Sequence, residues 1–210
     1  MKLSSSTFYH NDFIPEHCAF CIKDPENHTA FGDNKNPQLS WSEIPREAKS
    51  LILVCVDTSV PSSLDNFNQE GKTIAKDLPR VEFIHWSMVD ILPINGGVKE
   101  GECSNGIIPG GKKDPNGPAS SRQGINDYTG FMSGDPDMEG NYYGYDGPCP
   151  PWNDELVHQY CFKLFACDFN RCSVEGAFTG QNVLKTIKGH VIAATELVGL
   201  YSLNPDLQQT

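Results

Sequence analysis

Several features that would mark common protein classes are missing from this sequence. It has no apolar run of the roughly 18 residues that a transmembrane helix needs, and its first residues, MKLSSSTFYHNDFIP, lack the apolar stretch of a secretory signal. Basic residues are scarce, since 16 Lys and Arg stand against 27 Asp and Glu, for a formal net charge of −11. Nucleic-acid binding needs a basic surface. We therefore expect a cytoplasmic protein with no membrane span and no nucleic-acid partner.

Motifs of common enzyme classes are absent as well. The chain has no P-loop, no dinucleotide-binding GxGxxG after a strand, no GxSxG and no HExxH. Of its eight cysteines, Cys18 and Cys21 form a single C-x-x-C next to His17. A zinc site would need two further ligands, and no second C-x-x-C exists. Without a secretory signal, reduced thiols are the default, so we predict free cysteines, no metal and no cofactor.

Apolar patterning predicts a mostly β domain. The run SLILVCVD at 50–57 is continuously apolar until it ends on Asp57, as in a strand buried on both faces. Alternation over 81–92 and from His158 to Ala166 predicts two further strands. Apolar residues recur at spacings of three and four over 179–197, which predicts an amphipathic helix that Gly189 divides. A last strand is expected over 197–202.

The length of 210 residues suits one domain, spanning 1–210, with inserted loops. The insertions are predicted near 21–31, 62–80 and 95–141, and the second has room for a short helix at 72–77. The third is long and rich in Gly, Pro, Asn and Asp, but it contains Tyr128 and Phe131 as possible anchors. Long loops in compact domains are either functional or disordered, and the aromatic residues favour an ordered loop.

A rigid loop leads toward the third strand. Gly144, Gly147 and three prolines restrict the segment YGYDGPCPP, which ends a few residues before His158. If the three strands are neighbours, then Asp57, His85 and His158 converge beside this loop. A carboxylate next to imidazole favours the charged form, so the group could form an anion cradle. The alternative is that each histidine is an ordinary core or surface residue.

An ordered set of motifs resembles the phosphatidylethanolamine-binding protein family, and more closely its bacterial, Raf-kinase-inhibitor-like branch. The set comprises LSWSEIP, LVCVDTSVP, FIHWSMVDILP, GINDYTG, YYGYDGPCPP, LVHQYCFKLFACD and GHVIAATELVGLYS, and it runs over nearly the whole chain. The resemblance implies a β-sandwich of a large and a small sheet with short helices near the C-terminus. It also implies a small anion pocket for phosphate-like or phospholipid head groups, and bacterial members suggest a homodimer.

The resemblance also implies which residues bind the ligand. The expected ligand-binding residues are Asp57, Ser59, Pro61, Phe83, His85, Tyr145, Gly147, Pro148, His158 and Tyr160. The chain departs from the family pattern at three positions. Ser59 replaces the second acid of the D-P-D-A-P turn, Phe83 replaces a tryptophan near the first histidine, and Gln159 replaces an arginine after the second. Loss of the acid should favour anions over an ammonium group such as ethanolamine.

Three functions are compatible with these residues. The first is a binding or regulatory protein that holds a phosphate-like small molecule or lipid head group, with a possible protein partner and kinase-inhibitor-like activity. The second is a hydrolase or phosphoryl-handling enzyme that uses the Asp57, His85 and His158 cluster. The third is an interaction protein with a vestigial pocket. The absence of a nucleophile–base pair favours binding over catalysis, so no catalytic residue is assigned.

Overall fold

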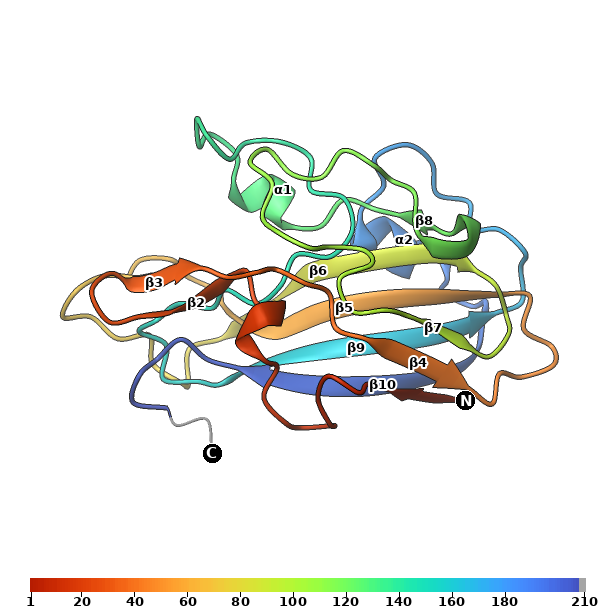
Figure 1. Cartoon of the computed structure of the whole chain (residues 1–210), viewed down its shortest axis with the longest axis horizontal. Coiled ribbons are helices and arrows are strands. Elements are labelled where there is room, and N and C mark those ends of the chain that lie inside the picture. Colours follow the sequence, from red (N-terminus) through yellow and green to blue (C-terminus); the bar gives the residue numbers. More distant parts are fainter. Residues whose placement is uncertain (208–210) are drawn as a thin grey trace.

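The computed structural model describes residues 1–207, and a five-stranded antiparallel sheet forms its centre (Figure 1). The strand order is β10-β9-β5-β6-β8. The bounds are Val191–Tyr201 for β10, His158–Cys167 for β9, Ser50–Pro61 for β5, Arg80–Ile91 for β6 and Arg122–Gln123 for β8. The three strands predicted from apolar patterning are therefore adjacent. β5 continues past the apolar run at 50–57 to Pro61, with bulges in its pairing to β6.

Strand β5 is buried on both faces because its alternating side chains enter two separate cores. Leu51, Leu53 and Cys55 belong to one hydrophobic cluster, whereas Ile52 and Val54 belong to the other. This is the period of two that a pleated strand imposes. A fully buried central strand accounts for the unbroken apolar run in the sequence.

A smaller sheet covers the first core. It has the order β1-β4-β7, with β1 at Lys2–Ser4, β4 at Leu39–Ser42 and β7 at Gly96–Val98. Its Leu39 and Trp41 pack in the same cluster as Leu53 and Trp86 of the large sheet. The predicted sandwich of a large and a small sheet is confirmed. The segment expected to be a loop at 21–31 is instead a hairpin of β2, Cys21–Asp24, and β3, His28–Phe31.

Short helices complete the described chain. They are η1 at Glu16–Cys18, η2 at Pro118–Ser120, α1 at Tyr128–Phe131 and α2 at Gly180–Thr186. Thr179 caps α2, and its side chain accepts the backbone N–H of Asn182 (3.2 Å). Val183 and Ile187 then pack on the second core. None of these helices has both the length and the apolar character needed to cross a membrane.

The helix predicted over 179–197 is wrong in its second half. α2 ends at Thr186, Gly189 has a φ of +87°, and β10 begins at Val191. The helical spacing of apolar residues continues past Gly189. The segment nevertheless forms the edge strand of the large sheet, where it pairs with β9 along its length apart from an irregularity between Val191 and Ala193. Residues 72–77 also form no helix. Ile74 instead makes a bridge to Asp154.

The prediction that all cysteines are free is also wrong. Cys21 forms a disulfide with Cys149, which lies 128 residues away in the sequence. The bond joins the start of the β2–β3 hairpin to the proline-rich loop before β9. Cys18, the other half of the C-x-x-C, remains a buried free thiol. Spacing alone could not identify this pair among eight cysteines.

Candidate functional site

The strand register brings the predicted polar residues to one end of the large sheet. Asp57 on β5 pairs with Tyr160 on β9 and with Phe83 on β6. His158 is two residues before Tyr160, and His85 is two residues after Phe83. Because alternate residues of a strand share a face, the side chains of all five can point to the same side. Neighbouring strands thus assemble the site.

A cavity of about 230 Å³ lies at this place. Six of the predicted residues line it: Asp57, Pro61, Phe83, His85, His158 and Tyr160. The remaining lining residues are Val60, Leu64, Phe67, Val81, Tyr128, Phe131, Cys149, Pro150 and Pro151. Leu64 and Phe131 are 56% and 48% exposed, whereas Asp57, His85 and His158 are buried. The cavity therefore combines a polar floor with a largely apolar wall and mouth.

His158 is held between two carboxylates. Its Nδ1 lies 2.8 Å from Oδ2 of Asp57, and its Nε2 lies 3.2 Å from Oδ2 of Asp154. Burial favours the neutral ring, but the charge of Asp57 and the hydrogen bonds of both carboxylates outweigh it and raise the pKa of His158 to about 9. At neutral pH the ring is an imidazolium that donates both protons inside the protein. Neither of its N–H groups is free for a ligand.

Arg80 completes this chain of charges. Its guanidinium lies 2.5 Å and 3.1 Å from the two oxygens of Asp154. Its remaining donors bind the backbone carbonyls of Ser59, Ala75 and Leu78. The series from Asp57 through His158 and Asp154 to Arg80 alternates in sign and has no net formal charge. Buried charges that are paired in this way avoid the cost of desolvation without a partner.

His85 has a different environment. Its Nδ1–H donates to the backbone carbonyl of Asp146 (2.7 Å), which directs Nε2 away from the loop. The ring contacts Phe83, Tyr128 and Tyr160, with centroid distances of 4.9, 5.6 and 5.1 Å. Burial is the largest influence and lowers the pKa of His85, although Asp57 opposes it. The expectation that Asp57 charges both histidines thus differs from the structure, where this ring is neutral at pH 7.

The Tyr160 hydroxyl is buried close to Asp57, but it has no hydrogen-bond partner of good geometry in the described part of the chain. Native proteins seldom leave such groups unpaired. The other oxygen of Asp57, Oδ1, accepts the backbone N–H of Ser59 (2.8 Å). At neutral pH, the floor therefore offers one hydroxyl donor from Tyr160 and one imidazole nitrogen from His85.

Four of the predicted ligand-binding residues do not line the cavity. Tyr145 is buried in the core, where its hydroxyl donates to the Cys18 carbonyl (2.7 Å). Gly147 donates its N–H to Oδ1 of Asn34 (2.8 Å). The carbonyl of Pro148 accepts the N–H groups of Phe20 and of Cys21, the first residue of β2. Ser59 accepts the N–H of Gln159 (3.1 Å) through its hydroxyl. These four residues do not contact the cavity, but their hydrogen bonds support the segments that form its wall.

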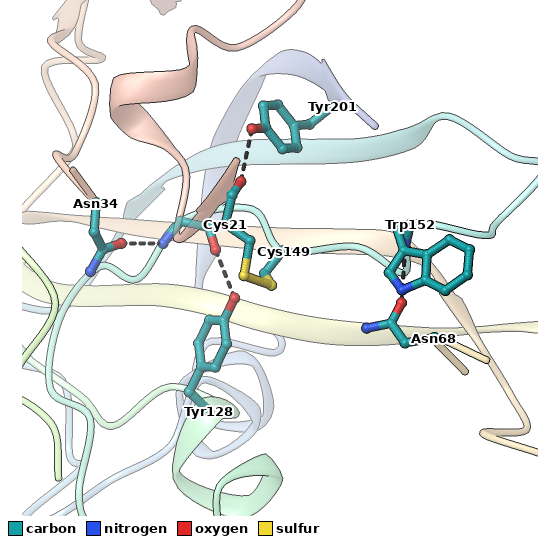
Figure 2. Close-up of a disulfide and its surroundings, with 8 residues drawn as sticks. Cys21, Asn34, Asn68, Tyr128, Cys149, Trp152 and Tyr201 are labelled. Carbon is teal, nitrogen blue, oxygen red and sulfur yellow. Dashed lines mark hydrogen bonds between the residues drawn. A yellow bond between two sulfur atoms is a disulfide. The ribbon is translucent and has the colours of Figure 1, made fainter. Parts of the chain in front are cut away.

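The proline-rich loop is fixed by covalent and polar contacts together. Figure 2 shows the Cys21–Cys149 disulfide, with the Tyr128 and Asn34 side chains directed toward the adjacent loop backbone. The Tyr128 hydroxyl donates to the Gly147 carbonyl (2.9 Å). The Tyr201 hydroxyl donates to the Cys21 carbonyl (2.8 Å) from the other side. The wall of the cavity is therefore preorganised.

A buried carboxylate anchors the loop next to His85. Asp146 accepts the ammonium of Lys112 and the amide of Asn34, each at 2.7 Å, and the amide of Asn126 at 2.8 Å. Its backbone carbonyl is the group that binds His85. The pair Asn126–Asp127 in the third insertion is ordered, since Asp127 accepts the N–H of Ile84 on β6 (2.7 Å). The prediction of an ordered loop is confirmed for this part.

Sequence reasoning missed Asp154 and Arg80, whereas the length of the insertions is compatible with a cover over the pocket mouth, a dimer contact or solvated loops. Asp154 stands four residues before His158, and Arg80 is the last residue of the second predicted insertion. The insertion at 62–80 supplies Leu64 and Phe67, while the insertion at 95–141 supplies Tyr128 and Phe131. The aromatic residues in otherwise polar loops were the only signal that could have indicated this role.

Solved structures share the fold of this chain. CT736, a phosphatidylethanolamine-binding protein homolog from Chlamydia trachomatis, superimposes with a TM-score of 0.63 at 28% identity, covering 95% of each chain. YbcL of Escherichia coli, described as a member of the mammalian family, gives a TM-score of 0.68 at 21% identity, with 96% of this chain and 97% of YbcL covered. The second likeness concerns the fold alone.

Sequence comparison agrees. A UPF0098 protein of Methanothermobacter thermautotrophicus is 33% identical over 177 residues, which are 84% of this chain and 89% of the relative. YbhB of E. coli is 25% identical over 96% of this chain and the whole relative. Fold and cavity define a β-sandwich with a small site at one end of its large sheet. The phosphatidylethanolamine-binding protein model matches residues 4–202, and the chain belongs to that family.

Proposed function

We propose that the cavity binds a small ligand with an anionic, phosphate-like head and an apolar part. The observation that carries the proposal is the floor, where the rings of His85 and Tyr160 lie 5.1 Å apart between centroids. Nδ1 of His85 is bound to the Asp146 carbonyl, and the Tyr160 hydroxyl has no partner of good geometry among the described residues. A buried hydroxyl without a partner is costly, and a ligand oxygen would accept its proton. Small-molecule sites commonly pair a few polar groups with apolar walls.

The charges of the floor specify how an anion would bind. Asp57, His158, Asp154 and Arg80 already neutralise one another, and the loop prolines carry no N–H. An anion therefore needs His85 to accept a proton at Nε2 and become a second donor. Binding then includes the uptake of one proton. Affinity for a phosphate-like head should rise as pH falls toward the ordinary histidine pKa of about 6.5.

The mouth favours an apolar group next to the head. Leu64, Phe67, Val81 and Phe131 surround the entrance, and the first and last of these are about half exposed. Burying an apolar group there would contribute about 25 cal/mol for each Å² removed from water. A phospholipid head group with the start of its chains and a small phosphate ester share this chemistry. Binding assays with both can distinguish the two sources.

The hydrolase alternative has less support. The described cavity lining contains no serine or threonine, and its one cysteine, Cys149, is in the disulfide. Both nitrogens of His158 are bound to carboxylates, which leaves this ring unsuited to act as a base. Kinase modulation, a protein partner and a homodimer remain proposals that depend on family membership.

A cytoplasmic location also remains a proposal, and the disulfide argues against it. The expectation rested on the missing secretory signal and led to the prediction of reduced thiols, whereas disulfides persist mainly in oxidising compartments. Intracellular proteins of hyperthermophiles are an exception. Labelling of free thiols in protein taken directly from cells would show whether Cys21 and Cys149 are paired in their native compartment.

The test of the binding proposal is a thermal-shift and calorimetric titration with phosphate, phosphoethanolamine and a short-chain phosphatidic acid. His85→Asn is the informative variant, because its amide can still donate to the Asp146 carbonyl while Nε2 is lost. We expect binding at least about tenfold weaker in this variant, since one bond to a charged group is worth roughly 1.5–3 kcal/mol. His190→Asn, at an exposed histidine paired with Asp168, is the control. Equal affinity in His85→Asn and wild type would refute the proposal.

A further inference from the structure

A second group of potential ligands lies outside the cavity, on the segment that precedes the disulfide. His17 and Cys18 belong to η1, and Glu100 follows β7. The ligand atoms of these three side chains all lie within 4.8 Å of one another. They come from two segments some eighty residues apart in the sequence. The fold, rather than a local motif, brings them together.

We propose that His17, Cys18 and Glu100 bind one Zn²⁺ ion. Zinc takes nitrogen, thiolate sulfur and carboxylate oxygen, usually in a tetrahedron with bonds of about 2.0–2.3 Å. Nε2 of His17 is 3.2 Å from Oε2 of Glu100, which is close to the edge of such a tetrahedron. Three protein ligands leave a fourth position for water. The two anionic ligands match the charge of the ion, and binding releases the Cys18 thiol proton to solvent.

The unliganded arrangement leaves the ligand atoms poorly satisfied. Nε2 of His17 is buried and, despite its distance from Glu100, has no partner in hydrogen-bond geometry among the described residues. The Cys18 thiol is free and fully buried beside it. The His17 and Glu100 side chains are 39% and 40% exposed, so the cluster lies close to the surface although Nε2 and the thiol are buried. The buried Cys18 thiol distinguishes this cluster from an ordinary surface ion pair between a histidine and a carboxylate.

Neighbouring contacts already hold two of the three ligand residues, Glu100 by its side chain and Cys18 by its backbone. The Thr7 hydroxyl donates to Oε2 of Glu100 (2.8 Å), and the N–H of Gln38 donates to Thr7 (3.0 Å). The carbonyl of Cys18 accepts the Tyr145 hydroxyl. Groups that hold metal ligands in this way commonly change affinity by about 10–100-fold. The site therefore has support of the kind that known metal centres use.

One neighbour opposes a cation. Lys35 lies beside the cluster, because its backbone N–H donates to the His17 carbonyl (3.0 Å). Its ammonium is directed at Asp33, 3.3 Å away, which reduces the repulsion of an ion. The proposal predicts that removal of this charge tightens binding. A purely structural role for the cluster predicts no effect of Lys35 on metal affinity.

The experiment is a Co²⁺ titration of the full chain with its disulfide intact, followed by displacement with Zn²⁺ in competition with a chelating dye. We expect one equivalent of Co²⁺ to give a thiolate-to-cobalt charge-transfer band. His17→Ala and Glu100→Gln should each weaken binding at least about tenfold, and Lys35→Met should tighten it. His190→Ala, at an exposed histidine–carboxylate pair without a thiol, should leave binding unchanged.

Two variants identify the sulfur. Cys18→Ser should abolish the charge-transfer band, and if this buried substitution prevents folding, the His17 and Glu100 variants still decide the question. The double variant Cys21→Ser/Cys149→Ser should keep the band, because those sulfurs are not ligands. The absence of a charge-transfer band in the wild-type chain, or an affinity in both His17→Ala and Glu100→Gln equal to that of wild type, would overturn the proposal.

Discussion

The two halves of the cavity floor each contain a buried histidine, yet the rings differ in charge. On the β9 half, His158 donates both protons to carboxylates and is cationic. On the β6 half, His85 donates one proton to the backbone carbonyl of Asp146 and is neutral at pH 7. Burial acts against the charge of both rings, so their hydrogen-bond partners decide the outcome. On the β9 half, both ring N–H groups of His158 are bound to carboxylates of the protein. On the β6 half, Nε2 of His85 remains available to a ligand.

The largest expected effect comes from the disulfide, which holds the loop that binds His85. Cys21→Ser/Cys149→Ser should lower the free energy of unfolding by about 5 kcal/mol, because the bond joins residues with a sequence separation of 128. Urea denaturation measures this. NMR chemical shifts of the histidine rings should distinguish the two halves of the floor. In the double variant, we expect the signal of His85 to change and that of His158 to stay as in wild type. The double variant should be insensitive to reductant, unlike wild type. A uniform shift of both rings would contradict the separation of the halves.

Asp57→Asn tests the β9 half. The substitution removes one of the two charges that hold the His158 imidazolium, and loss of one partner from a buried pair costs about 4 kcal/mol. Asp168→Asn is a matched control, because Asp168 and His190 also lie 2.8 Å apart but are about half exposed. We expect the control to cost under about 1 kcal/mol. Similar losses in both variants, measured by urea denaturation, would show that burial does not set the strength of the pair.

Much of the floor was predictable from the sequence, because it depends on strand pattern. The run that ends at Asp57 and the alternation around His85 and His158 identified three strands, and their adjacency placed these residues together. The partners that set the charges were not predictable in this way. Asp154 acts from a turn, and Asp146 acts on His85 through its backbone carbonyl rather than its side chain.

Two errors show where local pattern is insufficient. Val191 to Leu197 fits a helical spacing, but pairing with β9 makes the segment a strand. A short apolar segment cannot indicate which partner it will find. The Cys21–Cys149 bond likewise depends on the approach of a hairpin and a loop that are distant in the sequence. Long-range contacts of this kind leave little trace in spacing or composition.

The two histidines predict opposite pH limits of stability. The pKa of His158 is raised from 6.5 to about 9 on folding, so its contribution is complete below 6.5 and is lost as pH rises through 9. This loss amounts to about 3 kcal/mol. The pKa of His85 is lowered, so its contribution is present above 6.5 and is lost as pH falls through the lower value of the folded state.

Urea denaturation across pH, with His158→Gln and His85→Asn, tests these windows. The first variant should flatten the alkaline side of the stability profile, and the second should flatten the acid side. His190→Asn, at the exposed pair, should change neither side. If each variant altered the same side, the assignment of a charged ring to β9 and a neutral ring to β6 would be wrong.

The smallest effect on stability is expected for Tyr160→Phe, at the junction of the two halves. The hydroxyl has no partner among the described residues, so its removal relieves an unpaired polar group. The free energy of unfolding should stay level or rise by up to about 1 kcal/mol. Binding of phosphate should weaken by about tenfold, because the floor loses its hydroxyl donor. The control is Tyr201→Phe, whose hydroxyl donates to the Cys21 carbonyl and whose loss should lower stability. A clear loss of stability in Tyr160→Phe, with unchanged phosphate binding, would mean that this hydroxyl belongs to the β9 half of the floor.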